Sequence, residues 1–145
     1  MAFSNYLEDA LLKHIFTSTG YTSPNANLYV GLMTAAPSDT TTGATATEPS
    51  TSNSYGRIAV TNWTVSGTNP TQVTNDSAIE WSTATGSWGT ISHVGVFDNS
   101  TVGSGNLLAY VNLSDPDDST VTVTKTVNNG DVFRILAQKL SIRLY

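Results

Sequence analysis

The chain has few of the side chains from which enzymes build active sites. Its 145 residues include no Cys, two His and only 12% charged residues. Nucleophilic, acid–base and metal-assisted catalysis all need reactive or ligating side chains that lie close together. The absence of Cys also excludes a disulfide framework and a Cys-ligated zinc site. The composition therefore favours a protein that acts through its surfaces, and we predict no enzymatic activity.

Positive charge and long apolar runs are also scarce. Six Lys and Arg stand against eleven Asp and Glu, which gives a formal net charge of −5. Nucleic-acid binding needs clustered basic residues that neutralise phosphates, so we predict no nucleic-acid partner. The opening MAFSNYLEDALLKHIF is too short and too charged to span a membrane, and it lacks the features of a signal peptide. We expect no membrane partner and synthesis in a cytoplasm without signal-peptide export.

One segment does show helical periodicity, at the N-terminus. Asn5 is the predicted cap, with Glu8 three residues later as in a capping box. Apolar residues then recur on one face, at Leu7, Leu11 and Ile15. The pattern predicts a helix that packs either against the core of its own domain or against a neighbouring subunit, because terminal position alone does not decide between them.

The rest of the chain has the alternation of β-strands. The strongest run extends from Thr90 to Asp98, with apolar residues on both faces. About eight strands at short spacing predict a mainly β fold, a β-sandwich or jelly roll with one N-terminal α-helix. We expect a helix near residues 5–17, a helical arm over residues 1–20 and a β-sandwich domain over residues 21–145. The predicted buried residues are Trp88, Val94, Val96, Phe97, Leu107 and Ile142.

Residues 38–53 form a stretch rich in Thr, Ser, Gly and Pro with no apolar spacing. This connection is longer than most in a compact domain. Ordering such a loop costs about 1–2 kcal/mol of backbone entropy per residue. We therefore expect the loop to be ordered only by a partner, and to serve assembly rather than the stability of the domain.

Two kinds of residue remain as candidates for chemistry. His93 alternates with apolar residues, which favours a hydrogen-bonded core or interface histidine over a catalytic base. Asp115, Asp117 and Asp118 could offer oxygens to Ca²⁺, but they lack the ligand spacing of a known calcium loop. Acidic turns also form for another reason, because Asp accepts hydrogen bonds from its own backbone.

Acidic pairs are the last possibility for catalysis. Glu8 with Glu48, or Glu80 with Asp98, could in principle meet as the two carboxylates of a glycosidase, but no spacing along the chain supports either pair. We predict no catalytic, cofactor-binding or metal-binding residues and no cofactor. Four Asn-x-Ser/Thr sequons are interpreted as a by-product of the Thr, Ser and Asn content; they begin at Asn62, Asn75, Asn99 and Asn112.

Several of these stretches also carry a family resemblance. They are SNYLEDALLKHIF at the N-terminus, LYVGLMTAAP at 28–37, SYGRIAV at 54–60, WGTISHVGVFD at 88–98, NLLAYVNL at 106–113 and NGDVFRI at 129–135. Together they resemble a group of small tailed-bacteriophage virion proteins that are often labelled tail fibre proteins. The resemblance extends over nearly the whole chain and implies a structural component of the virion, made in the host cytoplasm, with no catalytic residues.

Within that group, a single domain with an N-terminal arm and no visible repeat suits a capsid decoration or cement protein better than a fibre shaft. An acidic, Thr-rich surface also suits exposure on the particle. We therefore expect a homo-oligomer on the virion exterior that binds other virion proteins, the major capsid protein above all. The alternatives are a tail fibre or receptor-binding module, and a carbohydrate-binding β-sandwich that uses exposed Trp and Tyr side chains.

Overall fold

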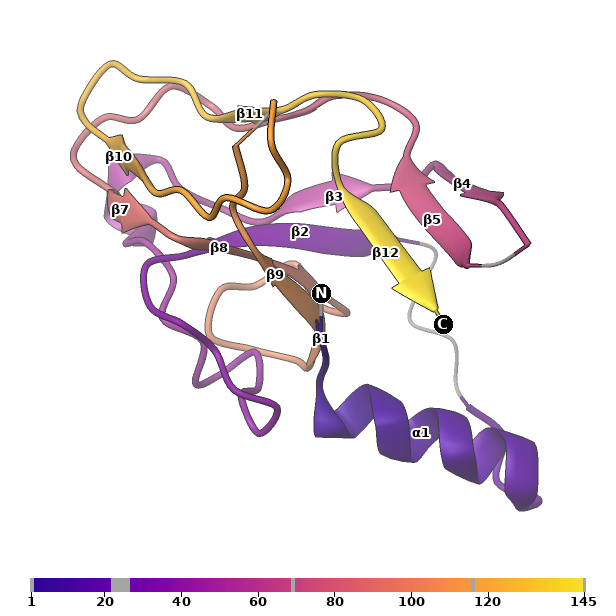
Figure 1. The fold of residues 1–145 in the computed structure, drawn as a ribbon. Helices are drawn as coiled ribbons and strands as arrows, with labels where there is room; N and C mark the ends of the chain where they lie inside the picture. Colours follow the sequence, from indigo (N-terminus) through magenta and orange to yellow (C-terminus); the bar gives the residue numbers. More distant parts are fainter. Residues whose placement is uncertain (1, 22–26, 69, 116, 145) are drawn as a thin grey trace.

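A computed structural model describes residues 2–21, 27–68, 70–115 and 117–144. These residues form a mainly β fold with one α-helix, α1 (Asn5–Phe16), near the N-terminus (Figure 1). Twelve strands are described, paired in antiparallel sheets, and this confirms the predicted fold class. The number of strands exceeds the predicted number of about eight, because six of the strands are only two or three residues long. Strands that short show no recognisable alternation in the sequence.

The largest sheet has five strands in the order β1–β9–β8–β2–β3. Their bounds are β1 (Ala2–Phe3), β9 (Leu107–Asn112), β8 (His93–Phe97), β2 (Leu28–Met33) and β3 (Ile58–Val60). The central strands β2 and β8 pair over five residues, from Tyr29 opposite Phe97 to Met33 opposite His93. This pair forms the middle of the molecule.

Three smaller sheets complete the fold. β7 (Gly89–Ile91) pairs with β10 (Lys125–Val127), and β6 (Ile79–Glu80) pairs with β11 (Arg134–Ile135). The third sheet has the order β12–β5–β4, with bounds β12 (Ser141–Leu144), β5 (Thr71–Asn75) and β4 (Trp63–Ser66). In Figure 1 this three-stranded sheet lies at the end of the molecule beyond β3.

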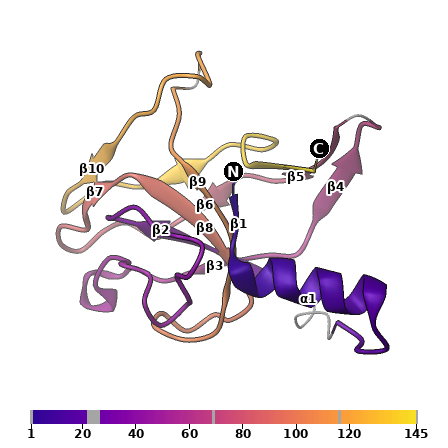
Figure 2. The same cartoon turned by 60° about the horizontal axis from the view of Figure 1, so that its bottom comes forward.

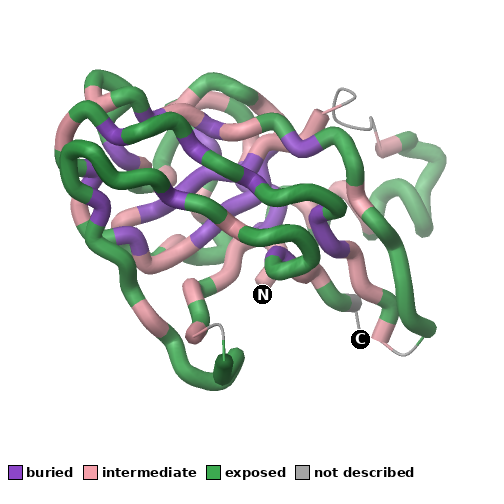
Figure 3. Tube along the Cα trace, turned by 90° about the horizontal axis from the view of Figure 1, so that it is seen from above, coloured by how far each residue is buried: buried purple, intermediate pink, exposed green. Residues whose placement is uncertain are grey.

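The main core draws its residues from the five-stranded sheet on one side and the smaller sheets on the other. Figure 3 shows the buried residues gathered in the interior of the trace. Alternate residues of the two central strands point into this core, as expected for a β-strand. They are Val30 and Leu32 of β2, and Val94 and Val96 of β8. Its other buried members include Tyr55, Trp81, Trp88 and Phe133. Two edge-to-face ring pairs join them, Tyr55 with Trp88 and Trp81 with Phe133, at centroid distances of 5.4 and 5.5 Å.

The opposite face of the five-stranded sheet carries a second core. Met33, Phe97 and Leu107 are each fully buried there. The run from Thr90 to Asp98 is therefore apolar on both faces because both faces are covered within this chain. The run is also two strands rather than one. At Ser92 the chain leaves the sheet with β10 and enters the sheet with β2, and the Ser92 amide donates to Met33 O at 3.0 Å.

The loop over residues 38–53 covers this second core, contrary to the expectation that only a partner would order it. Its Gly43 amide donates to Gly105 O at 2.9 Å, and the Thr34 amide of the strand end donates to Thr47 O at 2.9 Å. Ala46 packs against the second core, and residues Thr51–Asn53 form a short 3-10 helix. The loop belongs to the body of the domain, so the expectation that only a partner would order it is wrong.

Five of the six predicted core residues are buried: Trp88, Val94, Val96, Phe97 and Leu107. Ile142 is the exception, being half-buried. It lies on β12, where it only packs against the margin of the main core. The three-stranded sheet extends past the five-stranded sheet, so its side chains are less covered.

Helix α1 begins one residue earlier than the predicted cap implies. Ser4, not Asn5, is the N-cap, and its hydroxyl oxygen accepts a hydrogen bond from the Leu7 amide at 3.4 Å. The same buried hydroxyl donates to Leu107 O, while β1 pairs with β9 just before the helix. The N-terminal end of the proposed arm is thus fixed to the five-stranded sheet. Residues 22–26, which follow the proposed domain boundary, lie outside the described residues.

Candidate functional site

A buried ionic cluster lies over the second core. Arg57 and Glu48 form a salt bridge whose side chains are 0% and 1% exposed. The Arg57 Nε donates to both Glu48 carboxylate oxygens at 3.1 Å, and Nη2 donates to Oε2 at 2.7 Å. The guanidinium carbon also lies 3.7 Å from the centroid of the Phe97 ring, within the range of a cation–π contact.

The remaining donors of the cluster bind backbone carbonyls from separate loops. Arg57 Nη1 donates to Asn99 O and Ser104 O at 2.9 Å, and Nη2 donates to Gly43 O at 3.1 Å. All five guanidinium N–H groups are therefore used. A buried charge with every partner in place joins the loops rather than offering a reactive group, so the cluster is structural.

Tyr55 completes the cluster from the main-core side. Its hydroxyl donates to Glu48 Oε1 at 2.8 Å and accepts from the Leu32 amide at 2.8 Å. Burial, and then the negative charge of Glu48, hold the pKa of Tyr55 far above its ordinary value. Gly31 lies beneath the cluster, where a Cβ atom would meet Glu48 Oε1 at 2.6 Å. A side chain at this strand position would displace the carboxylate.

Helix α1 has a different character, because none of its twelve residues is buried. Leu7 alone among its apolar residues packs against the main core. Leu12, Ile15 and Phe16 are 58%, 65% and 78% exposed, and Figure 2 shows the helix running outward from the sheets. We call these three residues the α1 surface. It is a candidate docking surface, since it gathers large apolar side chains on one helix.

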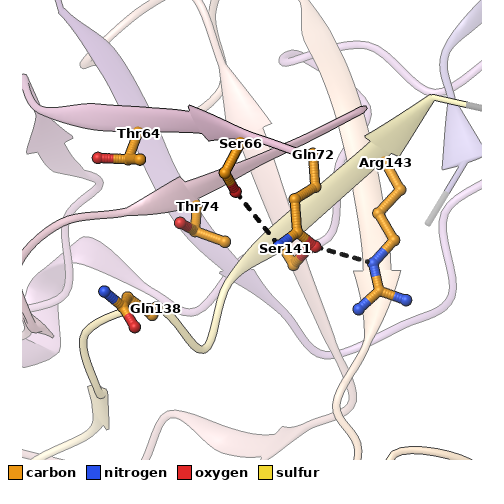
Figure 4. Close-up of a pocket in the computed structure, with 7 residues that line it drawn as sticks. All are labelled: Thr64, Ser66, Gln72, Thr74, Gln138, Ser141 and Arg143. Carbon is orange, nitrogen blue, oxygen red and sulfur yellow. Dashed lines mark hydrogen bonds between the residues drawn. The ribbon is translucent and has the colours of Figure 1, made fainter. Parts of the chain in front are cut away.

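A shallow hollow of about 360 Å³ lies on one face of the three-stranded sheet (Figure 4). All seven of the side chains that line it are polar. They are Thr64, Ser66, Gln72, Thr74, Gln138, Ser141 and Arg143. We call this feature the polar groove. Sequence reasoning missed it, because its residues meet only through the register of strands that are far apart in the chain.

His93 lies where the sequence places it, on a strand, and it is half-buried. Its Nδ1 and the Ser92 hydroxyl are 2.8 Å apart. Burial lowers the pKa of His93 below its ordinary value, against an opposing hydrogen bond with Asn112. It therefore fits the predicted role of a hydrogen-bonded histidine, because Ser92 and Asn112 are the partners described for its ring.

The acidic candidates are engaged separately. Asp115 accepts from the Asp117 amide at 2.9 Å, and Asp118 accepts from the Thr120 amide and hydroxyl at 3.0 and 2.6 Å. The two hydrogen bonds from Thr120 lower the pKa of Asp118 below its ordinary value. These are the local turn contacts expected of Asp. Among the described residues, no group of three or more His, Cys, Asp and Glu could hold a metal ion.

The proposed carboxylate pairs do not form either. Glu48 binds Arg57, and Glu80 pairs on the surface with Arg134 at 3.3 Å. Asp98 accepts from the Asn106 amide and side chain at 2.7 Å. Glu48, Glu80 and Asp98 thus each bind a different partner, which gives no support to a glycosidase site.

The three Trp side chains and the sequons are also placed. Trp81 and Trp88 are buried, and Trp63 is half-buried with its indole N–H donating to Val60 O at 3.1 Å. The alternative of a carbohydrate site on exposed Trp and Tyr side chains therefore finds no exposed Trp, while Tyr6 of α1 is 43% exposed. Asn75 is fully buried, so its sequon cannot carry a glycan.

Comparison of the chain with known protein families gives a match over nearly its whole length. A family model described as Podophage GP4 fiber I protein gp80 matches residues 2–143. The chain belongs to this family. The match confirms the resemblance to tail-fibre-type virion proteins that the sequence motifs indicated. No curated protein matches the chain.

Membership of the fibre I family establishes a structural protein of a phage fibre, located on the virion exterior and in contact with other virion proteins. It is consistent with the prediction of no enzymatic activity. No helix in the described part of the chain is long and apolar enough to cross a membrane. For a fibre protein, the ionic cluster is closed to partners, whereas the α1 surface and the polar groove are both open.

Proposed function

We propose that the protein is a structural subunit of a podophage tail fibre apparatus, attached to other virion proteins through the α1 surface. The observation that carries the proposal is the family match over residues 2–143, which covers nearly the entire chain. It favours the tail fibre alternative over the capsid decoration role that the sequence suggested. The body of sheets supplies a rigid module, and α1 supplies the attachment.

The physical argument for attachment rests on the stability of the helix. Isolated helices shorter than about 12–15 residues are marginal in water, and most helical stability in proteins comes from packing of an apolar face. α1 has 12 residues, and Ser4 caps it, but the α1 surface faces solvent. Fully burying a side chain such as Leu, Ile or Phe contributes about 1.5–3 kcal/mol. A partner that covers the α1 surface would therefore stabilise both the helix and the contact.

Capsid decoration, with the major capsid protein as partner, is the second candidate. The observation that favours it is the form of the described chain, in which loops and sheets close into one body rather than an elongated shaft. Either role fits a homo-oligomer. The two candidates differ in the number of copies on each particle.

Copy number on purified virions tests the choice. Quantitative mass spectrometry of the particle would compare this chain with the portal or tail proteins and with the major capsid protein. We expect a ratio close to that of the tail proteins. A ratio close to that of the major capsid protein would overturn the tail fibre role in favour of decoration.

Substitution of the α1 surface tests attachment. Leu12→Ser, Ile15→Ser and Phe16→Ser combined should leave the melting temperature of the isolated chain nearly unchanged, because these side chains are already exposed. Incorporation into particles should fall strongly. Val65→Ser is the matched control, since Val65 is 66% exposed on β4 and outside the helix. Normal incorporation of the helix variant would show that α1 is not the attachment surface.

A further inference from the structure

The polar groove is built from side chains in strict register. On β4, β5 and β12, alternate residues point to the same face and form two rows across the sheet. The first row is Thr64, Thr74 and Ser141, and the second is Ser66, Gln72 and Arg143. Figure 4 shows Gln72 at the centre of the second row, and Gln138 at the end of the groove that lies away from Arg143.

Hydrogen bonds within the second row orient its groups. Gln72 Nε2 donates to the Ser66 hydroxyl oxygen at 3.4 Å, and Gln72 Oε1 accepts from Arg143 Nε at 3.3 Å. Arg143 Nε donates its hydrogen bond to Gln72. The two terminal nitrogens of Arg143 have no hydrogen-bond partner among the described residues. A guanidinium held by one edge presents the rest of its fork to a ligand.

The charge of the groove is opposite to that of the protein. The chain has eleven acidic and six basic residues, but the described lining contains no carboxylate, and its one charged group is Arg143. Arginine recognises carboxylate and phosphate groups through paired N–H donors. The described lining combines an oriented arginine with hydroxyl and amide groups and has no carboxylate that competes for it, which suits an anionic ligand.

The backbone at Gln138 is held in a fixed position beside the groove. Gln138 has a left-handed backbone with φ of 63°, which is uncommon for a residue other than glycine. The backbone N–H of Gln138 donates to the backbone oxygen of Asn75 at 2.8 Å. The fully buried Asn75 side chain then fixes the same loop, donating to Leu136 O at 3.0 Å and accepting from the Leu140 amide at 2.9 Å. Backbone strain that the surroundings maintain is a reason to look for function.

We propose that the polar groove binds an acidic saccharide. Arg143 would bind its carboxylate or phosphate group, and the amides of Gln72 and Gln138 would bind ring hydroxyls together with the Ser and Thr hydroxyls of the two rows. The volume of about 360 Å³ is at the lower end of the range for small-molecule sites. This site is additional to the proposed attachment through α1 and does not depend on it.

Solvation alone would explain a polar sheet face, because antiparallel sheets commonly expose one polar side. It does not explain why Gln138 holds a left-handed backbone at the edge of the groove. The described lining residues include no aromatic ring, so stacking against a sugar contributes nothing there. Each site is therefore expected to be weak, and several copies on one particle would add binding strength through avidity.

Ligand titration of the isotopically labelled full chain by NMR tests the proposal. The probes are tetragalacturonate and glucose 6-phosphate as the two acidic saccharides, maltotetraose as a neutral saccharide, and inorganic phosphate. Both acidic saccharides should shift the side-chain resonances of Gln72, Gln138 and Arg143 Nε with saturation. Maltotetraose and inorganic phosphate should each bind at least about tenfold more weakly, because maltotetraose lacks the acidic group and inorganic phosphate lacks the ring hydroxyls.

Variants locate the binding. Arg143→Ala should weaken acidic saccharides by about tenfold or more, since it removes the charge-assisted hydrogen bonds. Gln138→Gly should also weaken them, while glycine keeps the left-handed backbone without strain. Arg134→Ala is the matched control, because Arg134 is a surface arginine paired with Glu80 and outside the groove. Its affinity should be unchanged.

Four results would overturn the proposal. They are no saturable shift with either acidic saccharide, equal binding of maltotetraose, equal binding of inorganic phosphate, and unchanged binding by Arg143→Ala. Because these measurements use the isolated chain, their failure would leave the proposed fibre role standing. A capsid-like copy number would in turn leave this site standing.

Discussion

Replacing Glu48 with Gln is the sharpest test of what holds the molecule together. The amide is nearly the same size as the carboxylate, so the substitution removes charge without opening a cavity. It leaves the Arg57 guanidinium buried, with its side chain 0% exposed and without its counterion. It also places an NH₂ group where Arg57 Nε or Nη2 now donates.

The expected cost follows from the contacts that remain. Removing one partner of a buried pair costs about 3–5 kcal/mol, because the other charge is left uncompensated. Three backbone carbonyls still accept from Arg57, and the new amide oxygen can still accept from Tyr55, so we expect the lower end of that range. For a domain of this size, about 3 kcal/mol corresponds to a fall in melting temperature of about 10 °C.

Urea unfolding and calorimetry of both forms measure this cost. Glu80→Gln is the matched control, because the Glu80–Arg134 pair is more than half exposed and a surface pair contributes about 1 kcal/mol at most. Glu48→Leu combined with Arg57→Met should recover much of the loss, since an apolar pair leaves no buried charge. A cost of Glu48→Gln below about 1 kcal/mol would refute the reasoning.

Further outcomes are expected in the same assays. Phe97→Ala should cost about 3–5 kcal/mol by calorimetry, because the ring is fully buried beneath Arg57. Tyr55→Phe should cost about 1–3 kcal/mol in urea unfolding, since the buried Leu32 amide loses its acceptor. Deletion of residues 40–50 should lower the melting temperature, as it removes Glu48; an unchanged value would restore the assembly role of this loop. Burial lowers the pKa of His93 in the folded chain, so the unfolded chain binds more protons in the ordinary histidine range. The free energy of unfolding should therefore fall as pH drops through that range, and the contribution of His93 should be present in full above it. His93→Gln should reduce that slope in urea unfolding at several pH values.

Sequence patterns predicted the parts of the fold that depend on local periodicity. The helix and the two-faced strand around Val94 and Phe97 both follow from apolar residues at regular spacing. The cap moved from Asn5 to Ser4 because the Ser4 hydroxyl also binds Leu107 O, a contact more than a hundred residues away. Such contacts leave no local signal.

The ionic cluster and the polar groove could not be predicted for the same reason. Nothing near Glu48 indicates that it is buried, since a Thr-rich loop looks solvated until Arg57 and the Phe97 ring lie beneath it. In the groove, Thr64, Thr74 and Ser141 become neighbours only when β5 pairs on both edges. A search for polar residues at alternate positions on strands that share a sheet would have found the groove, but only after the register was known.

The two faces of the five-stranded sheet explain why the open surfaces lie where they do. The smaller sheets cover one face, and the loops fixed by Arg57 cover the other, so β2 and β8 have no apolar face left for a partner. Contacts with other virion proteins can use elements outside these layers. α1 and the three-stranded sheet are two such elements, one with exposed apolar side chains and one with a polar groove. The proposed attachment and the proposed ligand binding can therefore be tested separately by mutation, because neither surface shares a residue with the core clusters.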